Sequence, residues 1–157
     1  KSAEEFGTPT VVEELLRAMS SFQINSTMEK IAEDPAGKKA KANNHAMDVV
    51  KMTQLHIRYV TYILMADKVK EIKDPNLRGH FTNLSVLVAL RFVSEFEQVA
   101  FACGYLKLSD NDLIGEAFKL MLEAIRPQAI PLVELMYIPD EVLCSAIGNS
   151  YGDIYET

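Results

Sequence analysis

Residue types that carry catalysis are sparse and scattered in this chain of 157 residues. Its three histidines, His45, His56 and His80, lack the spacing of metal ligands, and no Glu-x-x-His pair is present for a di-iron bundle. The sequence also contains no glycine-rich phosphate loop and no nucleophile-elbow motif. It therefore predicts no catalytic residue and no metal site, and it identifies no cofactor-binding residue.

Two charged or titratable residues have two possible roles each. His56 lies among apolar residues at helical spacing, where it either contacts a bound ligand or is a core histidine hydrogen-bonded to a neighbouring helix. Arg126 directly precedes Pro127. Its guanidinium either neutralises carbonyl groups at a helix C-terminus or binds a carboxylate or phosphate of a partner domain. Both alternatives stay open on the sequence alone.

Composition indicates one globular domain. Hydrophobic residues make up 48% of the chain and charged residues 24%, and the formal net charge is -6. This acidic balance argues against a nucleic-acid-binding surface. The most apolar run, residues 84–90, ends at Arg91 and is too short to span a membrane. Cys103 and Cys144 are far apart, which favours buried small hydrophobic residues in a reducing compartment.

The first part of the chain predicts a helix from Pro9 to about Phe22, with Thr8 as its N-cap. Residues 1–8 lack periodicity and read as a loose lead-in. The helical signal weakens after Gln23, and residues 34–37 form a break followed by lysines.

Two helices with clearer patterns follow. The second is expected over residues 44–72, with one apolar stripe formed by Val49, Met52, His56, Tyr59, Val60 and Ile63. The third is expected over residues 77–103 and is apolar almost all round, which makes it the most buried helix; its inward residues are Leu84, Leu87, Val88, Phe92, Phe96 and Val99. Arg91 and Glu95 are spaced to pair on its exposed edge, and Gly104 ends it.

A fourth helix is expected to begin at a capping box of Ser109 and Asp112 and to end at Arg126. Its inward residues are Leu113, Ala117, Leu120, Met121 and Ile125. The sequence therefore predicts an all-α fold, an up-and-down bundle of about four long helices.

The last part of the chain predicts a kinked segment, a short helix and a tail. Pro127 and Pro131 suit first turns or kinks, and Pro139 with Asp140 suits the start of a short helix that Gly148 ends. Residues 149–157 are expected to fold back so that the ring of Tyr155 packs on the bundle or on a partner domain.

This carboxy-terminal stretch resembles the acyl-CoA oxidases, the flavin enzymes of fatty acid β-oxidation. The resemblance covers residues 43–156 and is strongest over 125–156. It includes His56 and Tyr59, and its motif residues are Leu132-Val133-Glu134, Pro139-Asp140-Glu141-Val142-Leu143, Ser145-Ala146-Ile147-Gly148, Gly152 and Tyr155-Glu156. It implies a structural role for Arg126, Pro139, Asp140, Gly148, Gly152 and Tyr155.

The resemblance implies a carboxy-terminal helical domain that packs on an upstream flavin domain and supports a homodimer. It also implies FAD, bound mainly by the upstream part, an acyl-CoA substrate and a peroxisomal location. Residues 1–40 are then a lead-in helix and linker without assignment, and residues 41–157 the oxidase-like domain. Because the chain starts at Lys1 without Met, we expect a fragment or a processed piece.

Several polar positions depart from the family pattern. Glu134 replaces the usual Asp, and Asn149-Ser150-Tyr151 replaces an Arg-Tyr-Asp run. The chain ends without the peroxisomal tripeptide. An alternative hypothesis is therefore a non-enzymatic, oxidase-like helical module that serves as a structural or interaction subunit of a larger assembly.

We predict that this chain, expressed alone, is helical and neither retains flavin nor oxidises acyl-CoA. The reason is that its sequence has no phosphate-binding loop and no candidate base. Visible absorbance of the purified protein gives the flavin content, and peroxide formation gives the activity. A yellow preparation with stoichiometric flavin contradicts the prediction.

Overall fold

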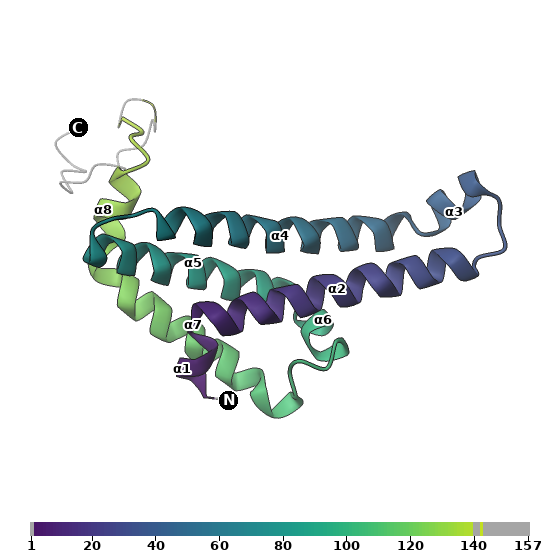
Figure 1. Ribbon diagram of the computed structural model, residues 1–157, viewed down its shortest axis with the longest axis horizontal. Coiled ribbons are helices and arrows are strands. Elements are labelled where there is room, and N and C mark those ends of the chain that lie inside the picture. Colours follow the sequence, from purple (N-terminus) through teal and green to yellow (C-terminus); the bar gives the residue numbers. More distant parts are fainter. Residues whose placement is uncertain (1, 140–141, 143–157) are drawn as a thin grey trace, which may run out of the picture.

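The computed structural model describes residues 2–139 and 142, and Figure 1 shows helices throughout this part. No strand occurs within these ranges. The four long helices are α2 (Pro9–Glu33), α4 (Ala46–Lys70), α5 (Pro75–Glu95) and α7 (Asn111–Ile125). The prediction of an all-α bundle with about four long helices is therefore confirmed.

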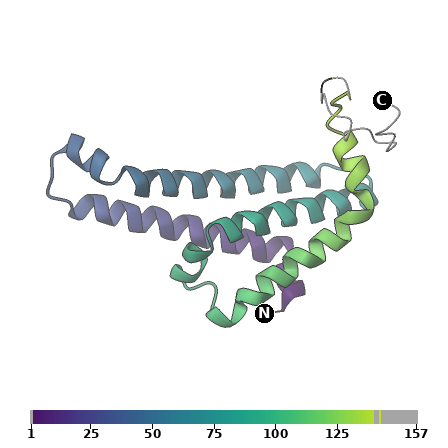
Figure 2. The ribbon, with the colours of Figure 1, turned by 180° about the vertical axis from the view of Figure 1, so that it is seen from behind.

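Three of the long helices lie side by side and the fourth crosses them. Figures 1 and 2 show α2, α4 and α5 running up and down, while α7 passes obliquely beneath them. Helix α5 contacts α2, α4 and α7, and α7 also contacts α1. The shorter elements are α1 (Ala3–Phe6), α3 (Lys38–Asn44), α6 (Glu97–Ala102) and α8 (Ala129–Glu134), with 3₁₀ turns at Leu108–Asp110 and Arg126–Gln128.

The chain forms a capped helix from its first described residues, so the loose lead-in predicted for residues 1–8 is wrong over residues 2–8. Helix α1 has a complete capping box, in which the Ser2 hydroxyl accepts from the Glu5 backbone and the Glu5 carboxylate accepts from the Ser2 backbone. Phe6 is fully buried beside α7. One turn has too few residues to show periodicity, so only the cap marks it in the sequence.

Helix α2 continues eleven residues beyond the predicted end at Phe22. The weak apolar pattern there reflects a buried polar pair, because the Gln23 amide donates to the Thr27 hydroxyl at 3.2 Å inside the bundle. Thr8 occupies the predicted N-cap position, but its hydroxyl donates to the Glu5 carbonyl instead. The predicted break is confirmed, since Asp34 is the C-cap.

Helix α4 was predicted from about residue 44 to 72, but its buried face differs from the predicted stripe. Leu55 and Tyr62 are its most buried side chains, and neither belongs to that stripe. Tyr59 and Ile63 do pack against the core, whereas Val60 is 39% exposed. The pattern was ambiguous because α4 carries apolar residues on an inner and an outer face.

The third predicted helix is two helices, because the backbone breaks at Phe96 between α5 and α6. Its large buried residues are Val86, Leu90 and Val93, together with the predicted Val99, and the small residues Ser85, Ala89 and Ala100 are buried beside them. The other predicted residues are only partly buried: Leu84, Leu87, Val88, Phe92 and Phe96. A helix that is apolar all round gives no periodic signal for its inner side. Gly104 ends α6 with φ of 73°, as predicted.

Helix α7 begins after a 3₁₀ turn, and the predicted Ser109–Asp112 capping box is wrong. Asp110 is the N-cap, and its carboxylate accepts from the Lys107 backbone rather than capping α7. Ala117 and Ile125 are buried as predicted, but Leu120 is 38% exposed. Ile114 is buried at 6% exposure, although the sequence analysis did not predict that it faces the core.

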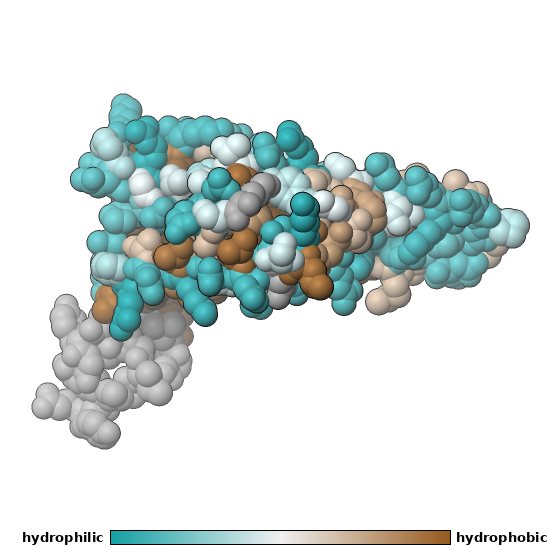
Figure 3. Space-filling view, turned by 90° about the horizontal axis from the view of Figure 1, so that it is seen from below, coloured by the Kyte–Doolittle hydropathy of each residue, from teal (hydrophilic) through white to brown (hydrophobic). Residues whose placement is uncertain are grey.

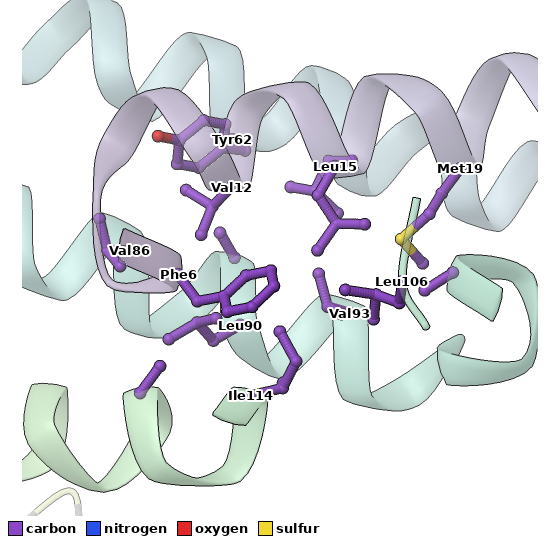
Figure 4. Packing of buried hydrophobic residues seen from close by; sticks show 14 of the residues in the cluster. Phe6, Val12, Leu15, Met19, Tyr62, Val86, Leu90, Val93, Leu106 and Ile114 are labelled. Atoms are coloured by element: carbon purple, nitrogen blue, oxygen red, sulfur yellow. The ribbon is translucent and has the colours of Figure 1, made fainter. Parts of the chain in front are cut away.

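One hydrophobic core joins α1, α2, α4, α5, α6 and α7. Figure 4 shows Phe6 between α2, α5 and α7, with Leu90 and Ile114 close to its ring. Val12 and Leu15 of α2 reach the same core from above. The core therefore includes residues on both sides of the predicted domain boundary at residue 40, and that boundary itself stays a prediction.

Residues 28–54 form an arm in which no side chain is buried. The arm consists of the end of α2, α3 and the start of α4, and it projects beyond α5 (Figure 1). Polar contacts hold it at its tip. His45 Nε2 lies 3.0 Å from Asp34 Oδ2, and Lys30 Nζ lies 2.8 Å from Asp48 Oδ1.

The hydrogen bonds of the arm affect its carboxylates. Backbone donation from Ala36 holds the pKa of Asp34 below its ordinary value, with further donation from Asn44, against an opposing effect of burial. Lys30 likewise lowers the pKa of Asp48. The ionised forms of both carboxylates therefore stabilise the arm.

Replacing Leu90 by Ala should lower the free energy of unfolding by about 2–5 kcal/mol, because the side chain is fully buried in the centre of the core. Urea denaturation followed by circular dichroism measures the change. Leu64→Ala, at a position 62% exposed, is the matched control and should cost less than about 1 kcal/mol. Equal costs for the two variants would place α5 at the surface.

The stability of the arm should fall in acid. A carboxylate whose pKa is lowered on folding contributes stability above its unfolded pKa, about 4, and loses it as the pH falls through the lower folded value. The denaturation midpoint of the parent chain should therefore drop below pH 4 more steeply than that of Asp34→Asn. Glu33→Gln, which removes the neighbouring carboxylate, is the control and should follow the parent chain.

Candidate docking surface

The outer face of α4 carries an apolar stripe that no other helix covers within the described part of the chain. Val50, Ile57 and Leu64 recur every seven residues, so they lie along one side of the helix over roughly 21 Å. Their side chains are 47%, 56% and 62% exposed. We call these three residues the α4 stripe, and Met47 extends it at 80% exposure.

The α4 stripe is also almost free of charge. Between Lys51 and Asp67 the helix carries one charged residue, Arg58. A helix that faces water normally has charged residues on that side, and the centre of a protein interface is depleted in them. The composition of this face is therefore typical of a surface that packs on protein.

Arg58 itself is fastened to α5. Its Nε donates to the Glu95 carboxylate at 2.8 Å, and its guanidinium lies 4.9 Å from the Phe96 ring centre and 5.6 Å from that of Phe92. Glu95 also pairs with Arg91 at 3.4 Å, as predicted. These contacts satisfy the one charge of this part of α4 within the bundle, so it need not be buried unpaired when the stripe is covered.

His56 was the candidate for ligand contact, and the structure places it beside the stripe rather than in the core. Its Nδ1 lies 3.1 Å from the Ser20 hydroxyl of α2, and its ring lies 6.5 Å from the Tyr59 ring. The residue is exposed, so the buried location is wrong while the hydrogen bond to a neighbouring helix is present. No other polar side chain of the described residues is positioned with His56 as a catalytic group.

A second apolar surface lies on α8 and the residues that follow it, at the end of the molecule opposite the arm (Figure 1). Tyr137 is 93% exposed and has φ of 53°, a backbone conformation that residues other than glycine rarely adopt. We call this set the α8 segment; its exposed apolar residues are Ile130, Val133, Leu135, Met136, Tyr137 and Ile138. Exposed aromatic and methionine side chains are enriched in protein interfaces.

The predicted motif residues fall in or beyond this segment. Arg126 is exposed in the 3₁₀ turn that follows α7, and its guanidinium has no partner among the described residues. Pro139 is exposed, and its carbonyl accepts from the Val142 backbone at 2.9 Å. Asp140, Gly148, Gly152 and Tyr155 lie outside the described residues, as does the expected docking of the tail. The roles of all six residues stay predictions.

The surface view shows how polar and apolar side chains are distributed. On the face that carries α1 and α7, apolar side chains gather near the middle of the molecule, and hydrophilic ones cover the far end of the arm (Figure 3). Within residues 2–139, no helix is long and apolar enough to cross a membrane. The same part of the chain holds no group of His, Cys, Asp and Glu that suits a metal ion.

A complete flavin site is not formed by the described residues. A groove of about 480 Å³ lies at the arm, lined by Ile31, Ala42 and Val49, with Lys38 and Lys41 at its edge. Lys41 is bound to the Ile31 carbonyl at 3.0 Å, and the groove has no glycine-rich loop to hold a pyrophosphate.

The sequence carried signals for the α4 stripe that the helical-pattern analysis did not use. The heptad recurrence of Val50, Ile57 and Leu64 and the scarcity of charge between Lys51 and Asp67 are both visible there. The exposure of these residues was not visible, because it depends on which side of α4 packs against α2 and α5. The α8 segment was predicted only as a kinked helix.

Comparison with known proteins gives the family context. The model of the acyl-CoA oxidase family matches residues 8–157. Peroxisomal acyl-coenzyme A oxidase 1 of Phascolarctos cinereus is 30% identical over 114 residues, which cover 73% of this chain and 17% of that protein. The Cavia porcellus protein of the same name is 24% identical over 155 residues, or 97% of this chain and 23% of that protein.

A solved structure shares the fold. Arabidopsis thaliana acyl-CoA oxidase 1 superposes with a TM-score of 0.90 at 17% sequence identity, covering 99% of this chain and 24% of that one. The chain thus spans about a fifth of the length of these relatives. Most of each relative therefore lies outside the region to which this chain is similar.

Proposed function

Because the chain belongs to the acyl-CoA oxidase family, we propose that it is the helical domain of a fatty acyl-CoA oxidase and that it packs on the flavin domain of that enzyme. The observation that carries this proposal is the uncovered, nearly uncharged α4 stripe. Each of its side chains would gain roughly 1 kcal/mol if a partner buried the exposed half. The arm, which buries no side chain of its own, would gain in the same way.

The enzyme containing this chain would oxidise a fatty acyl-CoA with FAD as the electron acceptor and pass the electrons to oxygen. The relatives named peroxisomal acyl-coenzyme A oxidase 1 support this activity and a peroxisomal location. FAD would be held mainly by residues outside this chain, since the described residues form no complete flavin site. The helices of this chain would position the flavin domain and exclude water from the contact.

Two separate apolar surfaces, the α4 stripe and the α8 segment, allow contact with two neighbours at once. A chain that packs on a flavin domain and also supports a homodimer needs two such surfaces. The rigid attachment of Arg58 to α5 keeps the outer face of α4 in one orientation relative to the core. A surface fixed in this way loses little conformational entropy when it docks.

The proposal predicts that Ile57→Glu separates folding from assembly. The side chain is 56% exposed, so the free energy of unfolding of the isolated chain should change by no more than about 1 kcal/mol. Assembly with the remainder of the oxidase should be strongly reduced, because docking would bury an unpaired carboxylate. Size-exclusion chromatography with flavin absorbance measures the assembled enzyme.

Leu108→Glu is the matched control, because Leu108 is 85% exposed but lies away from both surfaces, in the turn before α7. It should leave both stability and assembly unchanged. Assembly of the Ile57→Glu variant at the parent level would contradict docking through the α4 stripe. Assembly of the parent chain into a complex that contains no flavin would instead favour the non-enzymatic module.

A further inference from the structure

A cavity of about 170 Å³ lies between the first turn of α2, the second half of α4 and the first half of α5. Tyr62, Ala66 and Val69 form its wall on α4, and Pro9 closes it on the side of α2. The wall on α5 consists of Thr82 and Ser85. The cavity is separate from both the α4 stripe and the α8 segment.

The walls of the cavity offer no free hydrogen-bond donor. The Tyr62 hydroxyl donates to the Pro9 carbonyl at 2.9 Å, and the Thr82 and Ser85 hydroxyls donate to carbonyls one turn earlier in α5. Burial also raises the pKa of Tyr62 to about 12, helped by the charge of Glu13. A ligand in this cavity must therefore present an apolar body to the walls.

The rim of the cavity carries two cations with different surroundings. Lys70 Nζ is bound to the Asp67 carboxylate at 2.8 Å. Arg78 is exposed in the first turns of α5, and its guanidinium has no hydrogen-bond or ion-pair partner among the described residues. A cation near the positive end of a helix is unfavourable, so this position does not stabilise α5. The Asp74 carboxylate already caps this helix terminus by accepting from the Leu77 backbone at 2.7 Å, so the attraction for an anion at the rim comes from the Arg78 guanidinium.

We propose that this cavity binds a small aliphatic carboxylate, with its chain against Ala66 and Val69 and its carboxylate on the Arg78 guanidinium. A cavity of about 150 Å³ takes up benzene, so this one accommodates a chain of roughly six carbons. The planar fork of arginine holds a carboxylate through two parallel hydrogen bonds. This inference is independent of the proposed docking function.

The test is a titration of the ¹⁵N-labelled chain with hexanoate, followed by two-dimensional NMR. The amide signals of Ala66, Val69 and Thr82 should shift and saturate together. Hexan-1-ol, which has the same chain without the charge, should bind at least about tenfold more weakly, the usual effect of one charge-assisted hydrogen bond. Equal affinity for the two ligands, or no saturable shift at these residues, overturns the proposal.

Variants locate the two parts of the site. Arg78→Gln should weaken hexanoate binding by about tenfold and leave the affinity for hexan-1-ol unchanged. Arg91→Gln, an exposed arginine of the same helix outside the cavity, is the control and should change neither. Ala66→Leu should abolish binding of both ligands by filling the cavity. The amide spectrum of the Ala66→Leu variant shows whether that variant keeps the fold. If it does not, the comparison of hexanoate with hexan-1-ol on the parent chain still tests the proposal.

Discussion

The inner face of α5 lies against α2, α4 and α7, and burial of Val86, Leu90 and Val93 holds those three helices in place. The core therefore forms only along the length of α5. Helices α2 and α4 are 25 residues each and α5 is 21, and α5 is also displaced toward the end that carries α1 and α7. What α5 does not reach stays uncovered, which is why residues 28–54 bury no side chain. The uncovered arm is thus a consequence of the limited length of the core, whereas the outer face of α4 is exposed because it points away from α2 and α5.

Polar contacts take over where the core ends. At the tip of the arm, His45 and Lys30 pair with Asp34 and Asp48, and these contacts orient the α2–α4 hairpin without burying apolar surface. Partly exposed ion pairs contribute little to stability. The arm therefore keeps its shape but gains little free energy from these contacts, and the docking proposed for the α4 stripe would supply further burial. This division explains how one small chain combines a stable core with a surface suited to docking.

The sequence predicted those features that follow from local rules. The helix break at Asp34, the left-handed Gly104 and the Arg91–Glu95 pair each depend on a few neighbouring residues, and all three are present. The inward faces of α4 and α5 were predicted poorly. Helices that carry apolar residues on more than one side give a pattern that does not identify the side facing the core. For the same reason, the sequence predicted the family of the chain but not the apolar stripe on the outer face of α4.

The contrast between Leu90 and Leu64 shows that burial, rather than residue type, decides whether a leucine stabilises the core or stays available for contact with another surface. Both are leucines on long helices, yet one is fully buried and the other is 62% exposed. On the surface of an isolated bundle, a helix would ordinarily carry a charged residue at a position such as Leu64, since exposed apolar residues in a row favour association. Val50, Ile57 and Leu64 form such a row on one side of α4. Such a row on a face with a single, already paired charge is what the proposed contact with the flavin domain would require.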